Sequence, residues 1–294
     1  MKFILTFAAA AMIFGQSQPA RFTADVRLVR LLVNVKNAKG ELVGSLEKDQ
    51  FTVFDDNVRQ EIKVFERYTT TPLSVAALVD TSGSTRIDWQ TEVRSITKFF
   101  KALFAEGNER DAASLFTFNY DVTQQSDFTR SSKLLEDRLK YIKPEGGTSL
   151  YDAIYHAARN LQSREGRHVM VLVSDGGNTT SSKQYIEARE AAQRADAVIY
   201  PIIVVPIQND AGRNLGGEHA LQQLAADTGG RWFDATIEEL DKTFAEILRD
   251  LRAQYMIAYY PTDARKGFHQ VRVELNRPDL RATTRTGYYG EDPR

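Results

Sequence analysis

Residues 74–84 read Ser74-Val-Ala-Ala-Leu-Val-Asp80-Thr-Ser82-Gly-Ser84, a short apolar run with a polar end. The apolar part is typical of a strand that is buried on both faces of a parallel sheet. A helical pattern follows the polar end, and its expected buried stripe is Trp89, Val93, Ile96, Phe100, Leu103 and Phe104. Ligands of doubly wound α/β sheets bind where such strands end. One carboxylate and two hydroxyls at close quarters are hard oxygen donors, which suit Mg²⁺, Mn²⁺ or Ca²⁺.

Two later stretches supply matching parts. Gly146-Gly147-Thr148-Ser149 precedes another helical pattern, and Val169-Met-Val-Leu-Val-Ser174-Asp175 is a second buried-type strand that ends in an aspartate. Because parallel strands end at the same edge of a sheet, we expect Asp80 and Asp175 to lie together there. The loop that carries Thr148 is expected to close over them.

These three motifs, in this order, resemble the metal-ion-dependent adhesion site of von Willebrand factor type A domains. The resemblance covers roughly residues 72–251, and all five positions of the site match: Asp80, Ser82, Ser84, Thr148 and Asp175. It implies a doubly wound, mostly parallel sheet flanked by helices. It also implies that the three hydroxyls touch the metal directly, while the two aspartates act largely through water.

The chemistry of such a site suggests its use. Neutral hydroxyl ligands leave a divalent cation under-neutralised, and octahedral Mg²⁺ keeps a position for water or an outside ligand. The natural ligand is an Asp or Glu carboxylate of another protein. Taken alone, the Asp-x-Ser-x-Ser motif favours an Asx-turn and helix cap over a metal site, so the metal hypothesis depends on Thr148 and Asp175 as well.

The segments before and after this α/β pattern read as β-strands. Gly40 to Ile62, with Phe51-Thr-Val-Phe-Asp55-Asp56 at its centre, resembles the leader of secreted VWFA-related acidobacterial domain proteins. Gln254-Tyr-Met-Ile-Ala-Tyr-Tyr-Pro261 resembles the ending of that family. Asp55-Asp56-Asn57 is interpreted as a turn between two strands, since a calcium site would need a second ligand cluster.

The expected organisation has four parts. Residues 1–20 are a signal peptide, 21–70 an N-terminal β segment, 71–253 the von Willebrand factor A-like domain and 254–294 a C-terminal β segment. Neither β segment has enough strands to be stable alone. We therefore expect them to pair into one small β-sandwich, with the α/β domain inserted between them and the termini away from the metal-binding edge.

The N-terminal sequence and the composition limit the cellular location and the classes of binding partner that we expect. Lys2 precedes a short apolar run that ends at Phe14, a pattern that favours a cleaved secretory signal over an uncleaved anchor. The 294 residues include no cysteine, which excludes disulfides and a lipid-modified cysteine. A formal net charge of −1 gives no argument for nucleic acid or an anionic membrane. The mature chain is expected to be secreted or periplasmic, without membrane insertion.

An enzyme is the rival class. Haloacid-dehalogenase-like phosphatases need a second aspartate two residues after the first, where this chain has Ser82. No Gly-x-Ser-x-Gly nucleophile elbow is present. The four histidines lack metal-ligand spacing and are interpreted as surface or packing residues: His156, His168, His219 and His269.

The sequence therefore predicts no catalytic residue. It favours a secreted, metal-dependent protein-binding module for adhesion or scaffolding. A Mg²⁺-dependent hydrolase and a purely structural envelope scaffold are the alternatives.

Overall fold

The apolar run at residues 74–80 forms the centre of a six-stranded sheet. The computed structural model describes residues 28–67, 71–204, 214–263 and 265–290; the expected signal peptide lies outside these ranges. Strand β5 (Leu73–Asp80) is buried along its whole length. The sheet has the order β10-β9-β8-β5-β6-β7, in which only β7 is antiparallel to its neighbour. The other strands are β6 (Ala112–Phe118), β7 (Val122–Thr129), β8 (Arg167–Ser174), β9 (Ala197–Val204) and β10 (Phe233–Ala235).

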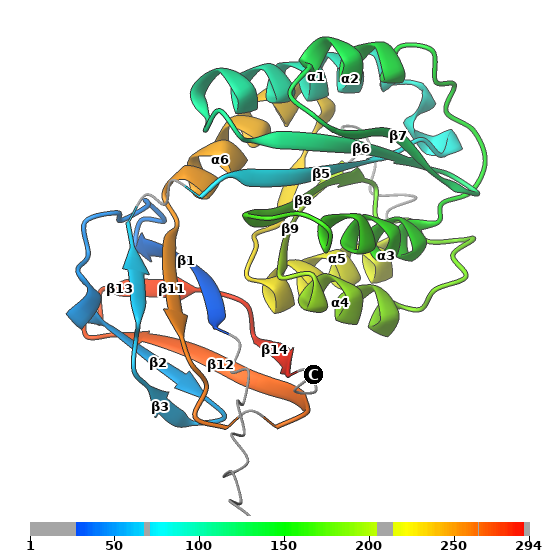
Figure 1. Cartoon of the computed structure of the whole chain (residues 1–294). Coiled ribbons are helices and arrows are strands. Elements are labelled where there is room, and N and C mark those ends of the chain that lie inside the picture. Colours follow the sequence, from blue (N-terminus) through cyan, green and yellow to red (C-terminus); the bar gives the residue numbers. More distant parts are fainter. Residues whose placement is uncertain (1–27, 68–70, 205–213, 264, 291–294) are drawn as a thin grey trace, which may run out of the picture.

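Helices cover both faces of this sheet (Figure 1). One apolar core joins the sheet to α1 (Trp89–Glu106), α2 (Ser132–Leu139) and α6 (Leu240–Arg252). A second core joins the opposite face to α3 (Leu150–Leu161), α4 (Tyr185–Arg194) and α5 (Leu215–Thr228). Short 3₁₀ turns lie at Lys48–Gln50, Gly83–Arg86 and Ile237–Glu239. The expected doubly wound α/β architecture is confirmed.

The N- and C-terminal segments build a β-sandwich together. One sheet has the order β13-β1-β11-β4 and the other β14-β12-β2-β3, so each combines strands from both ends of the chain. The early strands are β1 (Val29–Asn37), β2 (Phe51–Asp55), β3 (Val58–Gln60) and β4 (Val64–Glu66). The late strands are β11 (Tyr255–Tyr259), β12 (Gly267–Leu275), β13 (Leu280–Thr283) and β14 (Gly287–Gly290).

A third apolar core fills the space between these two sheets, with Leu31 and Ile257 from one sheet facing Val53 and Val271 from the other. The expectation that the two β segments share their sheets is confirmed. The exact domain boundaries remain a prediction.

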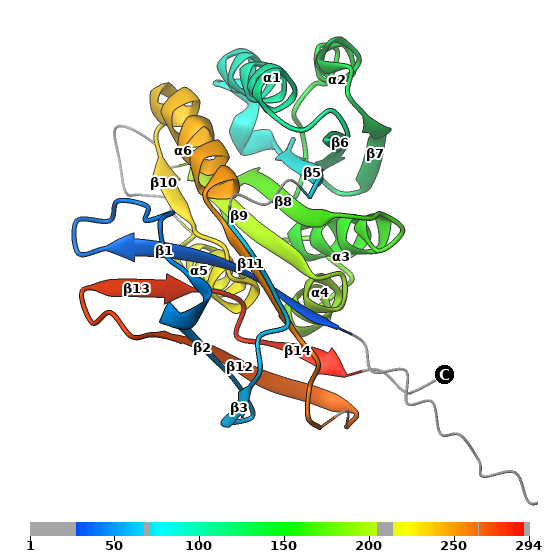
Figure 2. The same cartoon turned by 60° about the vertical axis from the view of Figure 1, so that its left-hand side comes forward.

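The sandwich joins the α/β domain at the edge where the parallel strands begin (Figure 2). Arg167, the first residue of β8, donates hydrogen bonds to the carbonyls of Thr71 (3.1 Å) and Leu251 (2.6 Å). Arg285, just before β14, pairs with Asp196 in front of β9. The carboxyl ends of β5 and β8 therefore lie at the opposite edge, away from the sandwich.

Candidate functional site

The carboxyl ends of β5 and β8 meet where the chain connections of the sheet reverse direction, the usual place for ligands in this architecture. Asp80 ends β5, and Asp175 directly follows β8. Asp80 is completely buried. Its Oδ1 accepts a hydrogen bond from the Ser82 backbone N–H (2.8 Å), and its Oδ2 accepts one from the Ser174 hydroxyl (2.7 Å). These bonds hold the Asp80 carboxylate against the end of the neighbouring strand.

The two serines of the Asp-x-Ser-x-Ser motif lie side by side. Ser82 is buried and Ser84 is exposed, and their hydroxyl oxygens are 3.0 Å apart. The 3₁₀ turn that begins at Gly83 brings both hydroxyls to the same side of the loop. Because either hydroxyl can donate to the other, both oxygens keep lone pairs that a cation could use.

Backbone hydrogen bonds bring the Thr148 loop to this place. The Gly83 N–H donates to the Gly146 carbonyl (3.2 Å), and the Thr148 carbonyl accepts from the N–H groups of Thr179 (2.8 Å) and Thr180 (3.1 Å). The loops after β5 and β8 are therefore both bonded to the loop that carries Thr148. Thr148 itself is buried.

Gly177 shows how close Thr148 and Asp175 lie. A Cβ atom at Gly177 would lie 3.1 Å from Asp175 Oδ1 and 3.4 Å from Thr148 Oγ1. Both oxygens therefore border the same small space, which a side chain at this position would enter. The Gly177 N–H donates to Asp175 Oδ1 (2.9 Å) and fixes that carboxylate.

Two carboxyl groups near this edge, Asp80 and Glu92, have raised pKa values. Burial raises the pKa of Asp80 to about 6; hydrogen bonds from Ser174 and Ser82 oppose that rise, and the Asp175 charge adds to it. Burial also raises the pKa of Glu92, on the first turn of α1, well above its usual value, and Asp80, Asp88 and Asp175 add to that rise. The charged groups that act on Glu92 are all acidic, while Arg86 of the loop after β5 donates to the Pro144 carbonyl (3.2 Å).

Sequence comparison assigns the α/β domain. The profile of the von Willebrand factor type A domain matches residues 74–246, more than half of the chain. The chain belongs to the von Willebrand factor type A family. Domains of this family commonly mediate protein–protein interactions. The comparison with curated proteins gives no significant match.

Solved structures share the fold of this A domain at low sequence identity. The von Willebrand factor domain of the type V pili tip protein Mfa5 from Porphyromonas gingivalis is 16% identical, with a TM-score of 0.52, 62% of this chain covered and 96% of that chain. The pilus adhesin SpaC from Lactobacillus rhamnosus GG is 8% identical, with a TM-score of 0.52, 88% of this chain covered and 41% of that chain. Proximal thread matrix protein 1 from the mussel byssus is 16% identical, with a TM-score of 0.51, 66% of this chain covered and 49% of that chain. These similarities show the fold alone.

The residues at this edge of the A domain fit a hard divalent cation. They offer hydroxyl and carboxylate oxygens, the ligands of Mg²⁺, Mn²⁺ and Ca²⁺, and no nitrogen or sulfur. The structure brings all five predicted residues to one edge: Asp80, Ser82, Ser84, Thr148 and Asp175. Their role as metal ligands stays a prediction.

The sequence prediction missed Glu92. The expected buried stripe of the helix after the Asp80–Ser84 loop did not include Glu92; it consisted of Trp89, Val93, Ile96, Phe100, Leu103 and Phe104. In the structure Glu92 is 2% exposed and lies on that buried face. The available signal was its position one helical turn before Ile96 and two turns before Phe99, because residues at that spacing share a face.

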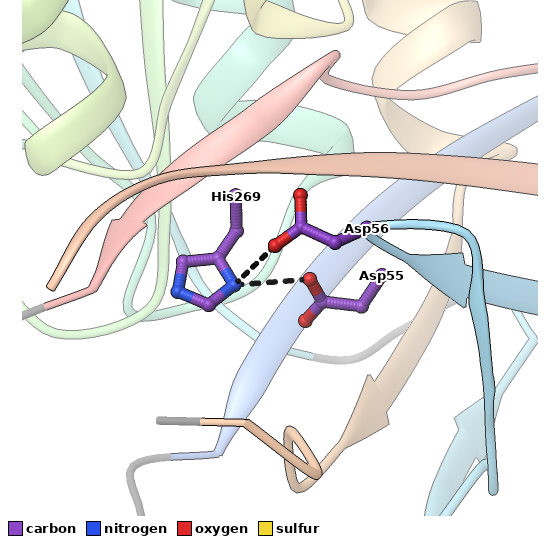
Figure 3. A group of neighbouring side chains, drawn as sticks. All are labelled: Asp55, Asp56 and His269. Atoms are coloured by element: carbon purple, nitrogen blue, oxygen red, sulfur yellow. Dashed lines mark hydrogen bonds and ion pairs between the residues drawn. The ribbon is translucent and has the colours of Figure 1, made fainter. Parts of the chain in front are cut away.

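A second group of acidic and histidine side chains lies in the β-sandwich (Figure 3). Nδ1 of His269, on β12, lies 3.1 Å from both Asp55 Oδ1 and Asp56 Oδ2. Asp55 Oδ2 also accepts hydrogen bonds from the hydroxyls of Tyr259 (3.0 Å) and Tyr288 (2.8 Å). Asp55, Asp56 and His269 therefore have the composition of a metal site, and sequence spacing did not reveal it.

The partners of this group favour a structural role. The Arg265 guanidinium lies 2.6 Å from Asp56 Oδ2, and the Arg265 carbonyl lies 2.9 Å from His269 Nε2. Burial opposes ionisation of Asp56, but hydrogen bonds from the Gln270 N–H and from Arg265 lower its pKa overall. A cation here would displace contacts that both carboxylates already make, so we interpret the group as a hydrogen-bonded cluster closed on its outer side by the Arg265–Asp56 ion pair.

The turn interpretation of Asp55-Asp56-Asn57 is confirmed. Asp56 and Asn57 have φ values of 46° and 65° and connect β2 to β3, the geometry of a type I′ hairpin. His269 is a packing residue as expected, since it is 1% exposed and stacks on Tyr288.

Within the described ranges, no helix has the length and apolar character needed to cross a bilayer.

Proposed function

We propose that the A domain binds a protein partner through a divalent cation, most suitably Mg²⁺, with Mn²⁺ or Ca²⁺ as alternatives. Ser82, Ser84 and Thr148 would offer their hydroxyls to the cation, and Asp80 and Asp175 would orient its bound water. The observation that carries this proposal is the convergence of hydroxyls and carboxylates at an edge where the charges acting on Glu92 are all negative.

The bound cation would supply a positive charge with a free coordination position. An Asp or Glu side chain of the partner fits that position in charge and in ligand chemistry. The site faces away from the sandwich, so a partner would approach it without contacting the sandwich. A pilus tip protein and a pilus adhesin with the same fold support a role in adhesion or scaffolding.

The proposal also covers the location of the protein, the roles of its parts and the absence of catalysis. The mature chain would be secreted or periplasmic after removal of residues 1–20. Residues 71–253 would act as the binding domain, while residues 21–70 and 254–294 would form the sandwich that presents it. The protein would not be an enzyme, because neither Asp80 nor Asp175 would be free to serve as a general base.

Calorimetric titration tests the proposal. The wild-type chain should bind Mg²⁺ and Mn²⁺, whereas a variant with Asp80→Ala and Ser82→Ala should bind neither. The exposed Arg159→Ala is a matched control on the same domain, and it should bind like the wild type. A wild-type protein that responds to neither metal would exclude the proposed mechanism.

A partner assay separates binding from catalysis. Retention of partners from culture medium should require Mg²⁺, should be lost in chelator and should be inhibited by acidic peptides. A broad phosphatase and esterase screen with Mg²⁺ should show no turnover. Turnover that disappears in Asp80→Ala would instead favour the hydrolase.

A further inference from the structure

Glu92 is a buried carboxylate with an unsatisfied oxygen. It lies in the first turn of α1, directly after the Asp-x-Ser-x-Ser loop, and is 2% exposed. Its Oε1 has no hydrogen-bond partner within the described structure. A buried carboxylate oxygen without a donor costs free energy unless something compensates its charge. The indole N–H of Trp89, one turn earlier on the same face, is also without a partner.

The neighbours of Glu92 increase that cost. Asp80 ends β5, Asp175 follows β8 and Asp88 directly precedes α1, and all three repel a negative charge on Glu92. No basic side chain is among the charged groups that act on it. The local packing therefore gives this carboxylate no counter-charge, although it is near enough to Asp80 and Asp175 for their charges to act on it.

We infer that Glu92 is a sixth residue of the cation site, which releases its proton when the cation binds and then stabilises the bound cation by its charge from inside the domain, without being a direct ligand. This inference rests on the proposed function. A divalent cation among Asp80, Asp175 and the three hydroxyls would offset the repulsion between the carboxylates. Glu92 would thereby strengthen cation binding before any partner supplies its own carboxylate.

The inference predicts two opposite effects of Glu92→Gln, which keeps the shape of the side chain and removes its charge. Mg²⁺ affinity should fall at least about tenfold, because a unit charge at close range in a buried setting is poorly screened. In chelator, the same variant should be more stable than the wild type, because it no longer buries an uncompensated carboxyl group. A residue that matters only for packing would not raise stability and lower metal affinity together.

Two variants of neighbouring residues serve as controls. Thr97→Val removes another buried hydroxyl without a hydrogen-bond partner from α1, farther from the loop, and should leave Mg²⁺ affinity unchanged. Asp88→Asn removes an exposed member of the acidic group and should lower affinity by less than about threefold, since water screens its charge.

The experiment is calorimetric titration of the whole chain with MgCl₂, together with urea unfolding in EDTA. Wild-type binding, weakened binding in Glu92→Gln and higher stability of that variant in EDTA would support the inference. Wild-type binding with an unchanged affinity in Glu92→Gln would overturn the inference and leave the proposed function intact. No wild-type binding would overturn both. A Glu92→Gln variant that fails to fold would contradict the expected gain in stability.

Discussion

At the scale of single residues, the burial of Asp80 makes stability depend on pH. Its pKa is raised to about 6 by burial, so the folded chain holds this proton more tightly than the unfolded chain does. The stability that Asp80 contributes is therefore complete below about pH 4 and is lost as the pH rises through about 6. Raising the pKa of Asp80 from 3.8 to about 6 corresponds to about 3 kcal/mol of free energy.

We expect Asp80→Asn to be more stable than the wild type above about pH 6 in chelator, by up to about 3 kcal/mol. The difference should shrink as the pH falls to about 4. Urea unfolding in EDTA across this pH range measures it. A difference that stays constant with pH would show that Asp80 does not titrate in this window.

Asp55 provides a second prediction at this scale. Asp55→Ala should lower the free energy of unfolding by about 3 kcal/mol, because it leaves Tyr259, Tyr288 and His269 without their shared acceptor. The exposed Asp49→Ala on the neighbouring turn should change it by less than about 0.5 kcal/mol.

Urea unfolding measures both variants, with and without EDTA. The chelator should leave wild-type sandwich stability unchanged if Asp55, Asp56 and His269 form a hydrogen-bonded cluster. If EDTA lowers the free energy of unfolding of the wild type as much as Asp55→Ala does, the three residues bind a metal instead.

The positions of the candidate site residues were predictable where short-range spacing carries the information. Asp80 ends β5, Ser82 and Ser84 follow it directly, and the ends of parallel strands bring Asp175 to the same edge. The contact between Asp55 and His269 was not predictable, because the two residues are 214 positions apart and only the pairing of β2 with β12 brings them together.

At the scale of elements, α1 and α6 are joined by aromatic stacking. Phe99 of α1 and Phe244 of α6 have ring centroids 4.9 Å apart, and both are buried. Phe244→Ala should therefore lower the free energy of unfolding by about 3–5 kcal/mol through loss of packing and creation of a cavity. Chemical denaturation compares this variant with Phe268→Ala. The Phe268 ring is partly exposed on the sandwich, so its removal should lower the free energy of unfolding much less. Equal losses for the two variants would contradict this.

Helical spacing predicted α1 but underestimated the width of its buried face. Phe99, Ser95 and Thr97 are buried beside the expected stripe, because this helix packs against the sheet and against α2 and α6. The periodicity of one sequence gives the direction of a buried face. Its width depends on neighbours from distant parts of the chain.

At the scale of the whole molecule, Arg167 holds together the two chain segments that connect the A domain to the sandwich. Its guanidinium binds the carbonyl of Thr71 before β5 and the carbonyl of Leu251 at the end of α6. Arg167→Ala would leave these contacts unmade and should lower the free energy of unfolding by about 3 kcal/mol. Scanning calorimetry should then show separate transitions of the sandwich and the A domain, because their cores are distinct. The exposed Arg159→Ala should retain the wild-type profile, and the same profile in Arg167→Ala would refute this role.

The sharing of sheets between the chain ends was predictable, since neither β segment alone had enough strands. The position of β1 between β11 and β13 could not be predicted from the sequence. That choice depends on side-chain packing between segments more than two hundred positions apart, such as Leu31 opposite Ile257.

Glu66 of β4 and Met256 of β11 are directly opposite each other on neighbouring antiparallel strands. The chain leaves the sandwich after Glu66, the end of β4, and enters it again at Tyr255, the start of β11. A two-residue turn is enough to close such a pair into a hairpin. The two chain ends that bound the A domain are thus already held side by side by strand pairing, so its insertion leaves the pairing of β4 with β11 continuous.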